Sequence, residues 1–190
     1  MLKRALTVLV PMLVATPLAA QDFAAAAKDY FDTEISEWAS AQVLIDAVNA
    51  QNTVTSGYSQ ADIDALDAAW RAEVGTSTTP TITPVLENVA ANFLRERVTG
   101  SGAAITEIFV TDAMGLNVAA SDLTSDYWQG DEAKHSETYA QGVSGFHISE
   151  VELDDSTQRY QAQVSFTLVD PSTGQAIGAV TVGVDAESLM

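Results

Sequence analysis

The 190-residue chain carries 26 acidic residues against 8 lysines and arginines, for a formal net charge of -18. That imbalance excludes nucleic acid as a partner, because phosphate recognition depends on clusters of Lys and Arg, and it disfavours docking on anionic lipid headgroups. Hydrophobic residues make up 47% of the chain, which is enough for the core of one domain. The absence of cysteine excludes thiol nucleophiles, Cys-ligated zinc and iron–sulfur clusters.

Residues 1–20 have the order of a secretory signal peptide. Two basic residues, Lys3 and Arg4, precede an apolar run, and small residues follow it before Gln21. This order predicts cleavage after Ala20 and export of the mature protein to the periplasm. Prolines interrupt the apolar run and no charged stop-transfer flank follows, so a lasting membrane anchor is the weaker interpretation.

Residues 21–100 are predicted to form a helical lead-in. Apolar side chains recur near the helical period over 23–50, which predicts one long helix. A second helix is predicted over 59–74, with Ser59 as its N-cap and Gly75 as its stop. A third helix is predicted over 85–98 and ends at the glycines that follow.

After Gly102 the hydrophobic period changes to that of β-strands. Strands are predicted over 104–112, 116–121, 146–153, 159–169 and 176–185, with a short helix over 131–142. Strict alternation over 160–168 predicts one buried and one exposed face of the sheet. Helices followed by five antiparallel strands define an α+β fold, and we expect residues 21–190 to form one domain whose sheet-bearing core is 101–190.

The chemistry-bearing residues form no catalytic pattern. No serine lies in a nucleophile-elbow motif, and no glycine-rich phosphate loop is present. Glu132 and His135 lie on one face of the predicted short helix, but that spacing is common by chance in so acidic a chain. The sequence therefore predicts no metal site and no cofactor, and it favours a protein that is not an enzyme.

Two segments carry a resemblance to a known family. IFVTDAMGLNVAASDLTSDYWQGDE, from Ile108, and the closing DPSTGQAIGAVTVGVD resemble the extracytoplasmic Cache-type sensor domains, which have a PAS-like fold. The resemblance covers residues 23–190 and is strongest over 105–185. It implies a long N-terminal helix and a five-stranded, PAS-like antiparallel sheet. The positions that match the family pattern are Asp112, Gly115, Ser121, Asp126, Tyr127, Trp128, Gly130, Asp131, Glu132 and Gly183 to Asp185.

The same resemblance implies a small-molecule site between the sheet and the segment after the second strand. Asp126, Tyr127 and Trp128 fall there, and His147 is the fourth candidate ligand-binding residue. Aromatic walls with a few polar groups suit a small molecule, and an acid favours a cationic or amino-bearing ligand. The alternative is that the two aromatic residues cover the core while Asp126 caps the following helix. Asp112 is expected to be a turn residue.

Receptors of this family continue into a transmembrane helix and a signalling output, whereas this sequence ends at Met190. We therefore expect a free-standing sensor domain that passes its signal to a separate receptor or transport partner. The alternative is an interaction protein of the same fold that binds no small ligand. In that case the apolar helix over 23–48 forms a homodimer, because it carries more apolar surface than one sheet face covers.

Overall fold

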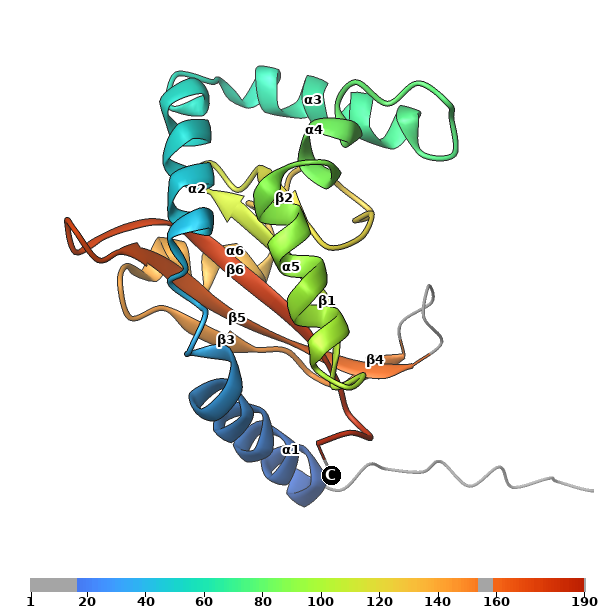
Figure 1. Cartoon of the computed structure of the whole chain (residues 1–190), viewed down its shortest axis with the longest axis vertical. Coiled ribbons are helices and arrows are strands. Elements are labelled where there is room, and N and C mark those ends of the chain that lie inside the picture. The colour runs from blue at the N-terminus through green and yellow to red at the C-terminus, as the bar shows by residue number, and fades with distance from the viewer. Residues whose placement is uncertain (1–16, 154–158, 190) are drawn as a thin grey trace, which may run out of the picture.

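The computed structural model describes residues 17–153 and 159–189. Helices occupy most of the chain up to Gly100, and an antiparallel sheet occupies most of the remainder (Figure 1). The predicted α+β class is therefore confirmed. Most of the predicted signal peptide, residues 1–16, lies outside the described residues. No helix in the described ranges combines the length and the apolar character that a membrane span requires.

The N-terminal helical region is broken in the middle. α1 (Pro17–Tyr30) runs into a π-helical turn (Phe31–Ile35), and α2 (Gln42–Thr55) begins only after residues 36–41. The single helix predicted over 23–50 is therefore wrong. A straight helix of that length would extend about 42 Å. The break lets both halves bury apolar side chains against the same face.

The next helices follow their local capping signals. α3 (Gln60–Glu73) begins with the predicted cap, Ser59. Ser59 and Asp62 form a capping box, in which the side chain of each residue accepts a hydrogen bond from the backbone N–H of the other. The helix predicted over 85–98 is divided into α4 (Ile82–Leu86) and α5 (Val89–Gly100). Asn88 begins α5 by accepting a hydrogen bond from Ala91 N at 2.8 Å, and its amide donates to Val118 O at 2.9 Å. This side chain thereby ties the start of α5 to the sheet.

The sheet has the order β2-β1-β6-β5-β3, and all its strand pairs are antiparallel. A two-residue β4 pairs with the same edge of β5 as β3, so the strand predicted over 146–153 is present as two short pieces. The five predicted strands are thus confirmed. Their bounds are β1 (Ile105–Asp112), β2 (Asn117–Ala120), β3 (Phe146–Ile148), β4 (Glu152–Leu153), β5 (Tyr160–Asp170) and β6 (Gln175–Asp185).

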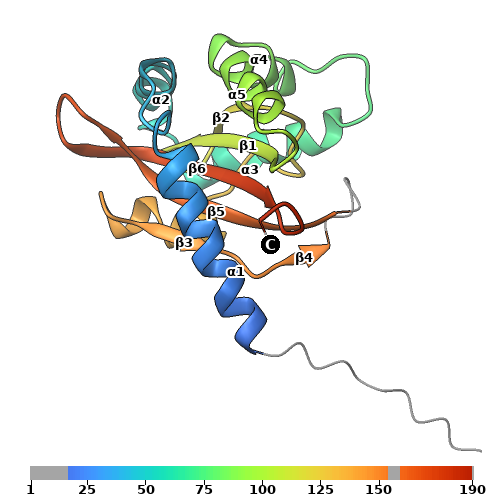
Figure 2. The same cartoon turned by 60° about the horizontal axis from the view of Figure 1, so that its bottom comes forward.

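One face of the sheet is apolar. Val164, Val182 and Ile108 lie side by side on paired strands and are fully buried. They belong to the main hydrophobic core, to which α1, α2 and α5 contribute. In Figures 1 and 2, α2 and α5 cover the side of the sheet near β1, and α1 lies toward β5 and β3. This face supplies most of the buried apolar surface that stabilises the fold.

The opposite face is polar over β3, β5 and β6, whereas on β1 it carries Phe109, which lies beside Thr181 and is buried in a second apolar cluster with Trp70. His147, Ser165 and Thr181 lie side by side on β3, β5 and β6, and alternation adds Thr111, Gln161, Gln163 and Thr167 to the same face. The sequence predicted that this face is exposed, and that prediction is wrong. α6 (Ala133–Ser136) and a 3-10 turn (Tyr139–Gln141) cover part of it, and they replace the single short helix predicted over 131–142. Ser165 and Thr181 are buried and hydrogen-bonded to each other at 3.1 Å.

Candidate functional site

The segment that carries Tyr127 and Trp128 is fixed between α3 and the start of β2. Asp67 of α3 is buried, and its Oδ1 accepts hydrogen bonds from Tyr127 N at 2.9 Å and Trp128 N at 3.1 Å. On the other side, Asn117 N donates to Tyr127 O at 3.0 Å. A buried carboxylate on one helix therefore determines where the two aromatic side chains point.

Tyr127 has one packed ring face and one free end. Its ring stacks on Trp70 with the centroids 5.3 Å apart, and Trp70 is fully buried. The Tyr127 hydroxyl has no hydrogen-bond partner among the residues that the structure describes. Burial, followed by the negative charge of Asp112 and the proximity of Tyr58, raises the pKa of Tyr127 to about 12.

Trp128 closes a turn of the backbone. Its Nε1 donates to Met114 O at 2.8 Å, and its indole lies directly against Gly130, where an added Cβ would come within 2.3 Å of Nε1. Gly115, in the same turn, has a φ of +81°, which favours glycine. These contacts agree with the alternative interpretation of Trp128 as a structural residue.

Asp126 forms an ion pair. Its Oδ1 lies 2.7 Å from Arg71 Nη1, and its Oδ2 accepts from Ser125 Oγ at 2.7 Å. Arg71 also pairs with Asp67. The alternative role predicted for Asp126, as a helix cap, is wrong, because the residue that precedes α6 is Glu132. Asp126 therefore shares its cation, Arg71, with Asp67.

The four predicted ligand-binding residues line three hollows, two of which share Glu132 as a lining residue. Tyr127 lines an apolar hollow, Asp126 and Trp128 line a small hollow beside Arg71, and His147 lines a polar hollow over the polar sheet face. Alternation places His147 on the sheet face that α6 covers, whereas the other three residues follow β2. The structure therefore does not bring all four together.

The polar hollow has a volume of about 480 Å³ and lies between α6, the β3–β4 edge and β5. Lys134 Nζ in its wall pairs with Glu132 Oε2 at 2.9 Å and lies 5.4 Å from the centre of the Phe109 ring. The imidazole of His147 has no hydrogen-bond partner within the described ranges. The lining residues are Glu132, Ala133, Lys134, His147, Ser149, Glu150, Glu152, Leu153, Gln161, Ala162 and Gln163.

Among the described residues, three buried polar atoms on or near this face lack a hydrogen-bond partner. They are Oε1 of Gln161, which lines the polar hollow, Nε2 of His135, on α6, and Oγ1 of Thr111, on β1. Burial lowers the pKa of His135, against the opposing effects of the backbone and carboxylate of Asp112. Within the residues that the structure describes, no three His, Asp or Glu side chains converge as a metal site would require.

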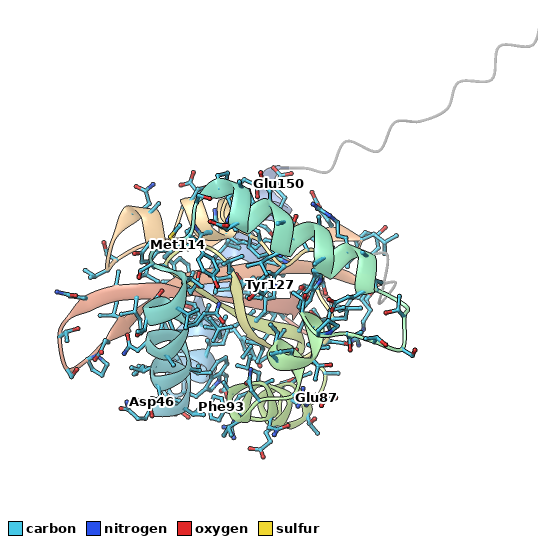
Figure 3. The ribbon with its side chains drawn as sticks, turned by 90° about the horizontal axis from the view of Figure 1, so that it is seen from above. Asp46, Glu87, Phe93, Met114, Tyr127 and Glu150 are labelled. Atoms are coloured by element: carbon cyan, nitrogen blue, oxygen red, sulfur yellow. The ribbon has the colours of Figure 1, made fainter. Side chains whose placement is uncertain are left out.

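The apolar hollow was missed by the sequence reasoning. Its volume is about 890 Å³, and its walls come from α2, α3, the α4–α5 junction and β2. Figure 3 shows α2, α3 and α5 arranged around the centre of the molecule, where Tyr127 is labelled. Small residues at Ala47, Ala50 and Ala90 were the available signal, because they leave space between facing helices. The only role that the sequence suggested for a helix of this region was the dimer contact of the helix over 23–48, in the alternative function.

No family model and no curated protein sequence matches the chain. Among solved structures, the chain is similar to the sensor domain of the V. cholerae histidine kinase DctB, with 16% identity and a TM-score of 0.47 over 90% of this chain. It is also similar to the ligand-binding domain of the Campylobacter jejuni chemoreceptor Tlp3 in complex with L-valine, with 12% identity and a TM-score of 0.43 over 92% of this chain. The chain spans 55% and 66% of those two structures. The first of these structures is a sensor domain, and the second is a ligand-binding domain.

Proposed function

We propose that the protein is a non-catalytic, sensor-type domain that binds a polar small molecule in the polar hollow and passes the bound state to a separate partner. One observation carries the proposal: the sheet face below α6 is polar and covered, yet a hollow of about 480 Å³ remains beside it. A sheet face that served packing alone would bury apolar side chains, as the opposite face does. Polar groups that converge on a concave surface are typical of ligand sites.

The charges of the polar hollow favour an amino-bearing ligand. Among the described lining residues there are three carboxylates, those of Glu132, Glu150 and Glu152, and one lysine, Lys134, which pairs with Glu132 and leaves the other two without a cation in the hollow. The carbonyl oxygen of Gln161 has no donor among the residues that the structure describes, so it is available to a hydrogen-bond donor of a ligand. Leaving a buried acceptor unpaired costs about 1–3 kcal/mol, so a ligand N–H that reached it would recover part of that free energy.

The proposed function also includes export of the protein and the passing of a signal to a partner. The order of residues 1–20 favours export to the periplasm, with a mature protein that begins at Gln21. N-terminal sequencing of the exported protein tests this, and recovery of intact Met1 in a membrane fraction would contradict it. We infer that ligand binding is passed on through a receptor or transport partner.

A thermal-melting screen of the mature protein tests ligand binding. Amino acids, other small amines, carboxylates and purines are the compounds to compare. A ligand present at 100 times its Kd stabilises the folded state by about 2.7 kcal/mol, which for a domain of this size raises Tm by about 5–10 °C. If no compound in any of these classes shifts Tm, the polar hollow is not a small-molecule site of this kind.

Matched variants locate the binding. Glu150→Gln removes one carboxylate from the polar hollow and should weaken an amino-bearing hit by about two- to five-fold, as expected for an exposed ion pair. Glu87→Gln changes an exposed acid that lines none of the three hollows and should leave the affinity unchanged. Equal affinities for the two variants would place the ligand elsewhere.

The second candidate function is an interaction protein that dimerises through its N-terminal helices. Its premise was surplus apolar surface, but the described helical side chains from Phe23 onward expose no large apolar group until Val54. Phe23, Ala27 and Ile35 are buried in the chain's own core. The homodimer stays a prediction, and light scattering at high protein concentration tests it.

A further inference from the structure

The apolar hollow presents exposed apolar side chains from facing elements. Val54 of α2 is 63% exposed and Val89 of α5 is 73% exposed, and both line the hollow. Single exposed valines are common on protein surfaces, but here two border one concave site. With a volume of about 890 Å³, the hollow lies within the usual range for small-molecule sites.

Most polar side chains of this hollow already have partners. Gln51 and Thr55 donate to the carboxylate of Asp112, and Asn88 is engaged in capping α5. The hydroxyls of Tyr58 and Tyr127 form no hydrogen bond with any described residue. Two hydroxyls among apolar walls are therefore free to bind a polar end of a ligand.

The electrostatic character of the hollow is negative. Of the described residues that line it, Asp46 alone has a carboxylate side chain, and none is Lys, Arg or His. Behind its wall, the buried carboxylate of Asp112 contributes to raising the pKa of Tyr127, which indicates a negative potential at that end. An anionic ligand would be repelled, and a cation would be attracted.

We propose that the apolar hollow is a second binding site, which takes a small organic amine with an apolar body. The apolar body of the amine lies between Val54 and Val89. Its ammonium group is attracted by the carboxylate of Asp46 and donates a hydrogen bond to the oxygen of a free tyrosine hydroxyl. This site is distinct from the polar hollow, with which it shares no lining residue. The two sites therefore differ in ligand chemistry as well as in position.

Three probes with the same phenyl group test the charge preference by isothermal titration calorimetry: 2-phenylethylamine, 2-phenylethanol and 3-phenylpropionate. We expect the amine to bind most tightly and the carboxylate most weakly. Asp46→Asn should lower the affinity for 2-phenylethylamine by about two- to five-fold. Its matched control is Asp64→Asn, because Asp64 also accepts an amide hydrogen bond at 2.8 Å from a glutamine four residues earlier but lies outside this hollow.

A space-filling variant tests the location. Ala50→Trp places an indole in the hollow from an exposed helical position and should reduce amine affinity at least ten-fold, whereas Ala68→Trp on the exposed face of α3 should not. The proposal is overturned if 3-phenylpropionate binds as tightly as the amine, or if Ala50→Trp leaves amine binding intact. It is also overturned if no probe binds and Ala50→Trp changes the mass in light scattering, since the hollow would then be a subunit interface.

The polar-hollow variant separates the two proposals. Glu150→Gln should leave the affinity for 2-phenylethylamine unchanged, because Glu150 does not line the apolar hollow. If Glu150→Gln weakens 2-phenylethylamine and Ala50→Trp does not, this amine binds in the polar hollow, and the second site is rejected while the proposed function stands.

Discussion

Thr55 donates a hydrogen bond from its hydroxyl to Asp112 Oδ2 at 2.8 Å, and both side chains are buried although they are 57 residues apart in the chain. Gln51 donates to the same oxygen at 3.0 Å, and Met114 N and Leu116 N donate to the other. Asp112 thus forms the turn that the sequence predicted and also fastens α2 to the end of β1. The buried carboxylate needs all these donors, because an ionised group removed from water is costly unless it is well hydrogen-bonded.

Thr55→Val tests this attachment. Valine has nearly the same shape but no donor, so one hydrogen bond to a buried carboxylate is lost, and we expect the free energy of unfolding to fall by about 1–3 kcal/mol. Thr53→Val is the matched control, because Thr53 is exposed and bonds only a carbonyl one turn back in its own helix. Urea unfolding of both variants measures the difference, and equal losses would contradict the role of Asp112.

Gly130→Ala tests the packing of Trp128. An alanine Cβ would overlap the indole, so we expect a loss of about 1–3 kcal/mol from overpacking. Gly57→Ala is the control, because a Cβ at Gly57 meets nothing within 4 Å, and its effect should stay within about 0.5 kcal/mol. If thermal unfolding gives the same Tm for both variants, Trp128 is free to move and is not part of the turn.

Asp67→Ala tests how the aromatic segment is held. The change leaves the backbone N–H groups of Tyr127 and Trp128 without their acceptor, so we expect a loss of about 1–3 kcal/mol or more. Asp126→Ala is the control, because Asp126 also pairs with Arg71 but accepts neither N–H, and it should cost about 0–1 kcal/mol. Comparable unfolding free energies for the two variants would show that the charge pairs, and not the two N–H bonds, hold the segment.

The stability should depend on pH through His135. Burial lowers the pKa of His135 in the folded protein, so the unfolded state binds its proton first as the pH falls. The contribution of buried, neutral His135 to the free energy of unfolding is therefore fully present above the ordinary histidine pKa of about 6.5. It is lost as the pH falls through and below that value. Urea unfolding at pH 7.5 and pH 5.5 should show a smaller loss for His135→Gln than for the unmodified protein. Parallel losses would exclude His135 as the cause.

Several features of the fold could be predicted because they depend on neighbouring residues. Alternation of apolar residues identified the strands, since successive side chains in a strand point to opposite faces. Ser59 and Gly75 bound α3 as predicted, because a cap hydrogen bond and a positive φ are local requirements. The long helix was predicted wrongly because residues on both sides of the break keep the helical period.

The composition of the sites was decided only by the tertiary structure. Tyr127 and Asp126 are adjacent in sequence, but Asp67 fixes the backbone between them, so that Tyr127 faces one hollow and Asp126 lies beside Arg71 in another. The sequence determined that the strand carrying Ser165 has one polar face. It did not determine that α6 would cover this face, because the positions of helices over a sheet depend on contacts between residues far apart in the chain. Hollows are formed by such contacts, and local periodicity carries no information about them.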